Sequence, residues 1–491
     1  MVAAVASITA ADVTLTLGPD TVESYTGRVY LTATQRRGAP RTISWTQPNP
    51  VFYIDVEDWR PDTPLVFGPD TPGHSIKRLG DFPSGEWTLQ AVIRTSNRSA
   101  SSLSGEGTVY SGTQRIVNRP DPGVPNAELL LDRVEPSPVL FPAGYGLEFF
   151  QVDSALLSEH FSKPFQLRAV IRVPDEASTD APVPTLYVIG GFPGSLQSSI
   201  MIPWLFGAHD EADELAIVYL EAEFTGGHSA FVDSASGGPW GTALVTELIP
   251  ALEKKFPLEP RRDARFLTGH SSGGWSSLWL ALEYPEVFGG TVSTAPDPVD
   301  FTRFQTVDIY APNANLYTSH DGQRAPLMRS GARPIMWADD FVAMESVLGE
   351  GGQMRSFEWA FSPRGPDGLP VPLWDRATGV IDPEIAKHWR RFDIAHRITR
   401  EWDTLEPVLK ERVLIVMGTQ DTFYLEGAAQ SLDAMLTTRG LGDVVELVPG
   451  DHSSILTPEM AKRIMQRALL MAGRTPPTAS DGSTEHTPSP P

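Results

Sequence analysis

The sequence predicts an α/β fold with a doubly wound, mostly parallel sheet, preceded by a small all-β domain. From about residue 130 onward, apolar strand-like runs alternate with segments of helical periodicity, as in a sheet covered by helices on both faces. The later runs are continuously apolar, which is typical of parallel strands buried on both sides. Residues 1 to about 120 show only short strands with period-two alternation.

The composition argues against several kinds of partner and site. A formal net charge of −22 argues against nucleic acid or an anionic membrane as the main partner. No apolar run approaches the roughly 18–20 residues that span a bilayer, so we expect no transmembrane segment. The chain has no cysteine, which removes disulfides, thiolate nucleophiles and thiolate metal sites. At 491 residues the chain is expected to form two domains.

The N-terminal region is predicted as a β-sandwich of immunoglobulin-like type over residues 1–120, followed by a linker over 121–135. In the third strand, Trp87, Leu89, Ala91 and Ile93 would share one buried face. The stretch "NRPDPGVPNAE" is rich in proline and polar residues, which is typical of a linker. Three segments carry the alternation: 12–18, 27–34 and 85–95.

The start of the chain, "MVAAVASITAADVTL", has small apolar residues but neither a basic segment nor a sustained apolar core of a signal peptide. It is compatible with the mature end of an exported protein. We therefore expect an extracellular or periplasmic protein, with a cytoplasmic one as the alternative.

The catalytic domain is predicted over residues 136–475, followed over 476–491 by a tail that is expected to be disordered because it is rich in proline and polar residues. More than a hundred residues separate two of its strands, so an insertion over about 300–410 is expected to form a cap over the site. The expected strands are 165–174, 185–192, 215–224, 264–269, 289–295, 412–418 and 444–450. The expected helices are 241–256, 272–284, 425–439 and 457–472.

The segment "LTGHSSGGW" (267–275) joins a predicted strand to a predicted helix through Gly269, Ser271 and Gly273. This Gly-x-Ser-x-Gly spacing between a strand and a helix is typical of a nucleophile elbow. The glycines leave room for a sharp turn that exposes the Ser271 hydroxyl above the sheet. The backbone N–H of Ser272 would then face a developing oxyanion.

A serine nucleophile needs a base and a group that orients the base. Asp421 follows the strand at 412–418 and His452 follows the next strand, so both would reach the same edge of the sheet. Glu426 and Asp451 remain alternatives for the acid. The histidines that compete with His452 are His228, His270, His388 and His396.

The second oxyanion donor is expected in "GGFPGS", the loop after the strand at 185–192, where the N–H of Phe192 is the first choice. Gly191, Trp240 and His270 are candidates for lining the substrate site. Trp275 and Trp279, four residues apart on the helix after the elbow, are expected in the core. Five arginines of the insertion receive no role: Arg303, Arg324, Arg329, Arg390 and Arg391.

With these motifs in place, roughly residues 145–472 resemble the "Putative esterase" family of the α/β-hydrolase superfamily, which includes esterase D, feruloyl esterases, enterochelin esterases and mycolyltransferases. The resemblance is carried by "YVIGGFPG", "HSAFVDSASGGPWGTALVTELIPALEKKF", "FLTGHSSGGWSSLWLALEYPEVFGGTVSTAP", "VLIVMGTQDTF" and "DHSSIL". It implies Ser271 as nucleophile, Asp421 as acid and His452 as base, with the backbone of Ser272 and Phe192 as oxyanion hole.

This chain departs from the family in three places. The loop reads "GGF" where many members carry an acidic residue or histidine before the glycine. The long insertion and the β domain are absent from the simplest members. A preceding β domain is similar to enterochelin esterases, but architecture alone does not carry over a substrate.

The expected activity is therefore that of a serine esterase that cleaves a small-molecule or carbohydrate-linked carboxylic ester through an acyl-enzyme. No metal or organic cofactor is required. Three alternatives remain: acyl transfer to a sugar or alcohol by the same triad, peptide cleavage, and a non-catalytic protein that binds a glycan or partner on a hydrolase scaffold.

Overall fold

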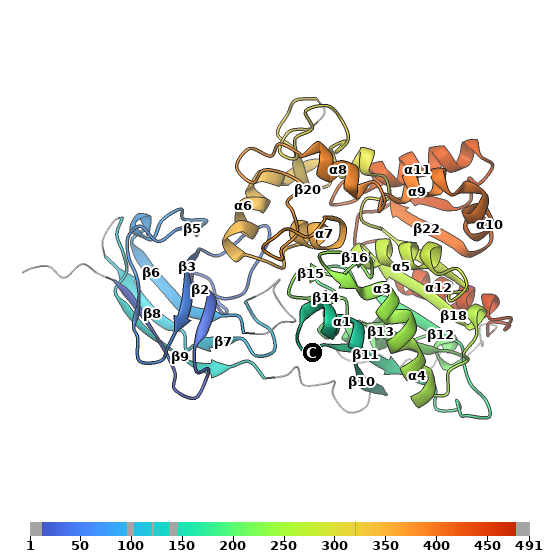
Figure 1. Ribbon diagram of the computed structural model, residues 1–491, viewed down its shortest axis with the longest axis horizontal. Helices are drawn as coiled ribbons and strands as arrows, with labels where there is room; N and C mark the ends of the chain where they lie inside the picture. The colour runs from blue at the N-terminus through green and yellow to red at the C-terminus, as the bar shows by residue number, and fades with distance from the viewer. Residues whose placement is uncertain (1–11, 96–102, 120–121, 137–145, 320, 478–491) are drawn as a thin grey trace, which may run out of the picture.

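The computed structural model describes residues 12–95, 103–119, 122–136, 146–319 and 321–477. An N-terminal β domain (blue in Figure 1) lies beside a larger α/β domain, and the insertion (yellow to orange) lies above the α/β sheet next to the β domain. No helix in these ranges is long and apolar enough to cross a membrane.

The β domain is one hydrogen-bonded sheet in the order β4-β1-β9-β7-β6-β2-β3-β5, with β8 paired to β6. All pairings are antiparallel except that of β1 with β9. Buried residues of β1, β2, β3, β6 and β9 share one apolar core, and the immunoglobulin-like arrangement in two sheets stays a prediction. The strands are β1 (Val13–Leu17), β2 (Tyr25–Thr34), β3 (Val51–Trp59), β4 (Leu65–Phe67), β5 (Gly73–His74), β6 (Gly85–Ile93), β7 (Val109–Ser111), β8 (Gln114–Asn118) and β9 (Ala127–Val134).

The boundary of the β domain lies later in the chain than expected. The predicted linker over 121–135 contains β9, which pairs with both β1 and β7. Its inward residues Ala127, Leu129 and Leu131 are buried in the core of the domain, while the residues between them are exposed. The domain therefore includes β9, and the prediction of a linker there was wrong, because this alternation outweighs the neighbouring prolines.

The α/β domain is built on an eight-stranded sheet in the order β10-β11-β13-β12-β18-β19-β22-β23. From β13 to β23 all neighbours are parallel, whereas β11 is antiparallel to β10 and β13. The mostly parallel α/β sheet is confirmed. The strands are β10 (Leu147–Asp153), β11 (Gln166–Arg172), β12 (Thr185–Ile189), β13 (Ala216–Leu220), β18 (Arg265–His270), β19 (Gly290–Thr294), β22 (Val413–Gly418) and β23 (Val445–Val448).

Helices cover both faces of this sheet. Buried residues of α2 and α12 pack with the strands in one apolar core. Buried residues of α3, α4, α5 and α11 belong to two other apolar cores, which also include strand residues. The predicted helix at 241–256 is interrupted by a wider turn over Leu244–Leu248, just before Pro250, whose nitrogen cannot donate a helical hydrogen bond. The helices are α2 (Met201–Leu205), α3 (Trp240–Ala243), α4 (Ile249–Lys255), α5 (Ser272–Glu283), α11 (Glu426–Thr438) and α12 (Pro458–Met471).

The insertion is structured and shares a core with the helices beneath it. Phe361 packs on Trp275 at a ring-centroid distance of 5.0 Å, and Trp275 stacks on Trp279 at 5.4 Å. Both tryptophans are core residues, as the sequence predicts. The elements of the insertion are β20 (Pro326–Ser330), β21 (Arg333–Trp337), α6 (Ala338–Leu348), α7 (Gln353–Phe361), α8 (Pro383–Trp389), α9 (Ile394–Arg400) and the start of α10 (Trp402–Arg412).

Candidate active site

Ser271 occupies a sharp turn between β18 and α5. Its backbone has φ 60° and ψ −124°, a conformation that is costly for any residue with a side chain. The turn is held by a 3.0 Å hydrogen bond from the Ser271 N–H to the carbonyl of Thr294. A Cβ on Gly269 would lie 2.0 Å from the carbonyl oxygen of Gly273, so the turn requires glycine at position 269.

His452 and Asp421 meet in a buried hydrogen bond. The Nδ1 of His452 lies 2.6 Å from the Oδ2 of Asp421, and the Asp421 side chain is fully buried. The other carboxylate oxygen of Asp421 accepts the N–H of Phe423 at 2.8 Å, and the Phe423 ring packs edge-on against His452 at 4.8 Å. Nδ1 of His452 therefore carries a proton toward the carboxylate, which leaves Nε2 as the nitrogen that can accept one.

The competing acids and histidines have other partners. Glu426 is paired with Arg329 at 2.6 Å, and exposed Asp451 accepts the N–H groups of Ser453 and Ser454. Of the rival histidines, His388 and His396 lie on α8 and α9 of the insertion. Of the three candidate acids, Asp421 is the one that bonds to the imidazole of residue 452.

Ser271 and His452 line one cavity of about 330 Å³. The predicted lining residues Gly191 and His270 and the predicted oxyanion residue Phe192 also line it. The rest of its wall is mostly apolar and comes largely from the insertion and the loop after β22. These residues are Trp45, Asp297, Gln305, Leu327, Phe341, Gln353, Met354, Phe357, Phe423, Leu425 and Ser453.

The loop after β12 passes directly beside the serine. A Cβ on Gly191 would lie 3.0 Å from the Cβ of Ser271, closer than ordinary van der Waals contact, so glycine favours this close approach of the backbone. Nε2 of His228 donates to the carbonyl of Gly190 at 3.1 Å, while its Nδ1 accepts the N–H of Ala230 at 3.0 Å. Burial lowers the pKa of His228 to about 4, so this imidazole is neutral near pH 7 and fixes the loop rather than transferring protons.

His270 packs against the imidazole of His452, with ring centroids 4.6 Å apart. Its Nδ1 lies 3.1 Å from the hydroxyl oxygen of Thr294, and that hydroxyl donates to the carbonyl of Gly269. Nδ1 of His270 is therefore the protonated nitrogen. Burial, with a smaller contribution from the nearby charge of His452, lowers the pKa of His270 to about 3. It is an uncharged wall of the site.

Sequence reasoning missed Asp297, a buried carboxyl beside the elbow. Its Oδ2 accepts the hydroxyl of Ser272 at 2.6 Å and the side-chain amide of Gln353 at 3.4 Å. Burial raises the pKa of Asp297 to about 6. Its place just after β19, at the same sheet edge as the other site residues, was the available signal.

Trp240 does not line the cavity, and the prediction that it does was wrong. Its indole is buried among Phe165, Phe224 and Phe231, at ring-centroid distances of 5.4–6.2 Å. Its Nε1 donates to the carbonyl of Gly237 at 2.8 Å. Trp240 is a core residue that anchors the start of α3.

Solved structures resemble this chain over about two thirds of its length. They include the fluorophosphonate-binding serine hydrolase F of Staphylococcus aureus (15% identity, 66% of this chain and 98% of that one, TM-score 0.37). An S-formylglutathione hydrolase from Agrobacterium tumefaciens matches with 18% identity over 67% and 98% of the chains, at a TM-score of 0.38. A ferulic acid esterase from Anaeromyces mucronatus matches with 15% identity over 67% and 97%, at a TM-score of 0.34.

No curated protein sequence matches the chain. The family model described as "Putative esterase" matches residues 165–454, which is more than half of the chain and contains the elbow, Asp421 and His452. This match confirms the resemblance noted in the sequence. The chain belongs to the "Putative esterase" family of α/β hydrolases.

Proposed function

We propose that this protein is a serine esterase that hydrolyses carboxylic esters through an acyl-enzyme, with Ser271, His452 and Asp421 as its triad. The observation that carries the proposal is the 2.6 Å contact between Nδ1 of His452 and the buried carboxylate of Asp421, at the edge of the cavity that Ser271 lines. Membership of an esterase family supports the same reaction class.

In the proposed reaction the hydroxyl oxygen of Ser271 attacks the ester carbonyl while Nε2 of His452 takes the hydroxyl proton. Asp421 keeps the imidazole in the required tautomer and stabilises its charged form. The tetrahedral intermediate collapses, and His452 returns the proton to the departing alcohol. Water then adds to the acyl-enzyme by the same route and releases the acid.

The oxyanion of both intermediates is proposed to bind the backbone N–H groups of Ser272 and Phe192. Ser272 is the first residue of α5, whose free N–H groups favour negative charge. The close approach of Gly191 to Ser271 supports the second donor, because it brings the following peptide beside the nucleophile.

The test compares three variants in fluorophosphonate labelling and p-nitrophenyl acetate hydrolysis. Ser271→Ala is expected to abolish both, because it removes the attacking oxygen. Asp421→Asn is expected to lower turnover by about 10³–10⁴-fold, since the amide cannot hold the same tautomer. The matched control is Asp451→Asn, one residue from His452 but exposed, which is expected to keep wild-type turnover. Labelling that persists in Ser271→Ala would refute the proposal.

A further inference from the structure

Trp45, a residue of the β domain, lies in the wall of the candidate active site. It is on the chain segment between β2 and β3, far from the α/β sheet in sequence, yet it lines the same cavity as Ser271 and His452. Nothing in the family match covers it, because that match begins at residue 165.

Three aromatic side chains from different parts of the molecule surround Trp45. Its ring centroid is 5.1 Å from Phe341 of α6, 5.8 Å from Phe192 of the oxyanion loop and 6.2 Å from Phe423. Phe423 in turn packs on the imidazole of His452. The indole therefore bridges the insertion, the oxyanion loop and the loop that carries the acid.

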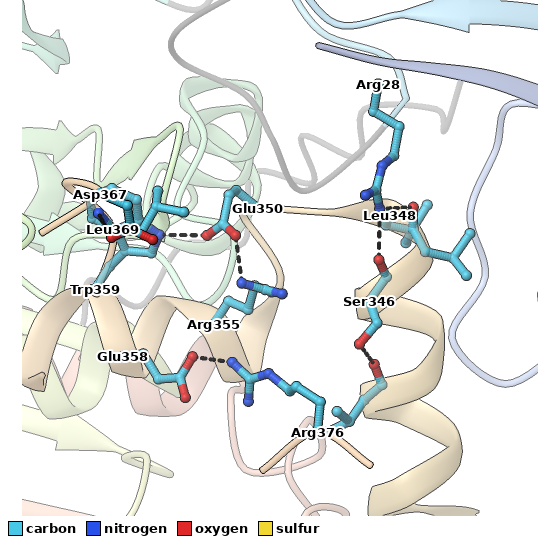
Figure 2. A network of polar contacts seen from close by, with 12 residues as sticks. Arg28, Ser346, Leu348, Glu350, Arg355, Glu358, Trp359, Asp367, Leu369 and Arg376 are labelled. Atoms are coloured by element: carbon cyan, nitrogen blue, oxygen red, sulfur yellow. Dashed lines mark hydrogen bonds and ion pairs between the residues drawn. The ribbon is translucent and has the colours of Figure 1, made fainter. Parts of the chain in front are cut away.

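The β domain is also fixed to the insertion at the far end of α6. The guanidinium of Arg28 donates to the carbonyls of Ser346 at 2.7 Å and Val347 at 2.9 Å, and Arg94 and Tyr30 donate to the carbonyl of Leu348. These are the last residues of α6, whose carbonyls have no partner within the helix. Figure 2 shows Arg28 directed at this helix end.

The connection from α6 to α7 carries this restraint onward to the cavity. The carboxylate of Glu350 accepts from Arg355 and, at 2.9 Å, from the indole of Trp359, both on α7 (Figure 2). The first turns of α7 supply Gln353, Met354 and Phe357 to the cavity wall. The β domain thus holds the two insertion helices that, with Trp45, form one side of the cavity.

The chemistry of this wall defines what it can contact. Asp297 is the one carboxylate among the described residues that line the cavity. An engineered apolar cavity of about 150 Å³ holds a benzene molecule. A cavity of about 330 Å³ is therefore larger than an acetyl group needs and accommodates an apolar group of ring size or more. Apolar surface is offered by Trp45, Leu327, Phe341, Met354, Phe357 and Phe423.

We infer that the β domain is part of the active site, and that Trp45 is a specificity-determining residue that favours esters with a bulky apolar group over acetyl or methyl esters. This inference rests on the proposed esterase function. The bulky group belongs either to the acyl side or to the alcohol side of the ester. On either side, apolar contact with the same cavity wall would recognise it.

The test measures selectivity as a ratio of kcat/KM values for two substrate pairs. The acyl pair is p-nitrophenyl 3-phenylpropanoate against p-nitrophenyl acetate, and the alcohol pair is 2-phenylethyl acetate against methyl acetate. Trp45→Ala is expected to lower the ratio at least tenfold in one pair, because kcat/KM for the large ester falls much further than kcat/KM for the small one. Trp45→Phe is expected to keep most of the ratio. The pair that responds identifies the side that Trp45 contacts.

Two controls make the outcome decisive. Trp204→Ala removes a tryptophan that is 64% exposed and outside the cavity, and both ratios are expected to stay at the wild-type value. Fluorophosphonate labelling of Trp45→Ala shows that Ser271 still reacts in the variant. Intact labelling with both ratios unchanged, or an equal loss on large and small esters, would overturn the role of Trp45. Wild-type protein that does not label at all would instead overturn the esterase proposal.

Discussion

Asp297 places a carboxyl group against the first turn of α5, at Ser272, the residue that follows the proposed nucleophile Ser271. Its bond to the Ser272 hydroxyl connects it to the residue whose N–H is the proposed oxyanion donor. Gln353 of α7 contacts both Ser272 and Asp297, so the insertion takes part in the same network. Because burial opposes ionisation, this carboxyl is a source of pH dependence.

Asp297→Asn is expected to stabilise the protein at pH 8. The folded-state pKa of about 6 lies above the ordinary 3.8, so the folded protein holds this proton more tightly than the unfolded chain does. The contribution of Asp297 to the free energy of unfolding is therefore fully present below about pH 4. It decreases as the pH rises to about 6 and is constant at higher pH. The variant avoids the loss, which is at most about 3 kcal/mol for a shift of this size. Urea unfolding at pH 4, 6 and 8 measures the difference.

The matched control has the opposite sign. Asp451 accepts backbone and hydroxyl hydrogen bonds from Ser454, with a further contribution from Ser453, and these lower its pKa. Asp451→Asn is therefore expected to be less stable than wild type at pH 8, with the difference vanishing in acid. A stability difference for Asp297→Asn that stays constant from pH 4 to 8 would contradict the raised pKa.

At the level of single residues, the sequence predicted the groups that follow strands. Ser271 directly follows β18, Asp421 lies three residues after β22 and His452 four residues after β23, and parallel strands bring such positions to one edge. Trp45 could not be found in this way. It belongs to another domain, and its contact with Phe341 joins positions almost three hundred residues apart.

The elbow is the element on which the site depends, and backbone contacts define it. A Cβ on Gly273 would lie 2.0 Å from the carbonyl oxygen of Ile189 and 2.5 Å from that of Gly190. The start of α5 is thus pressed against the end of β12, where the loop that contains Gly191 and Phe192 begins. Glycine at position 273 lets the turn at Ser271 and the loop after β12 touch.

Gly273→Ala is expected to destabilise the protein by about 3 kcal/mol or more and to slow fluorophosphonate labelling, because the backbone must move to admit the methyl group. The matched control is Gly427→Ala. Gly427 lies in α11 with open space around its Cβ position, so alanine is expected to be neutral or to stabilise by up to about 1 kcal/mol. Thermal unfolding and labelling rates compare the two, and equal behaviour would contradict the packing argument.

Elements were predictable in proportion to their length and periodicity. The helix α5 and the strands β18, β19, β22 and β23 carry long apolar patterns and were found within two residues, whereas the predictions for β12 and β13 ran three and four residues past the ends of these strands. Strands such as β5, with two residues, are too short to show a periodic pattern in the sequence. The edge strand β10 was missed because most of its residues are only partly buried and its pattern is weak. The fold of the insertion depends on contacts with α5 that no local pattern specifies.

For the molecule as a whole, the β domain and the insertion behave as one support for the cavity. Arg28 is anchored on its own domain by Asp55, at 2.8 Å and 2.9 Å, and by stacking on Tyr53. From there it reaches the end of α6. The side chains of Val347 and Leu348 pack against a small apolar cluster of the β domain that includes Tyr30. The interface between the β domain and α6 therefore combines hydrogen bonds with apolar packing, and it reaches the wall of the candidate active site.

Arg28→Ala is expected to loosen the end of α6 without changing the turn at Ser271, the proposed nucleophile. Two carbonyls lose a charged donor, which costs about 1–3 kcal/mol when the groups remain shielded from water. Hydrogen exchange should become faster at the backbone amides from residue 349 to 354, and fluorophosphonate labelling should persist. The matched control, Arg60→Ala, removes a 60% exposed side chain that pairs with Asp58 of its own domain. In this variant, hydrogen exchange at residues 349 to 354 should stay at the wild-type rate. Unchanged exchange across the α6–α7 connection in Arg28→Ala would mean that the β domain does not restrain the insertion, and that Trp45 reaches the cavity without this support.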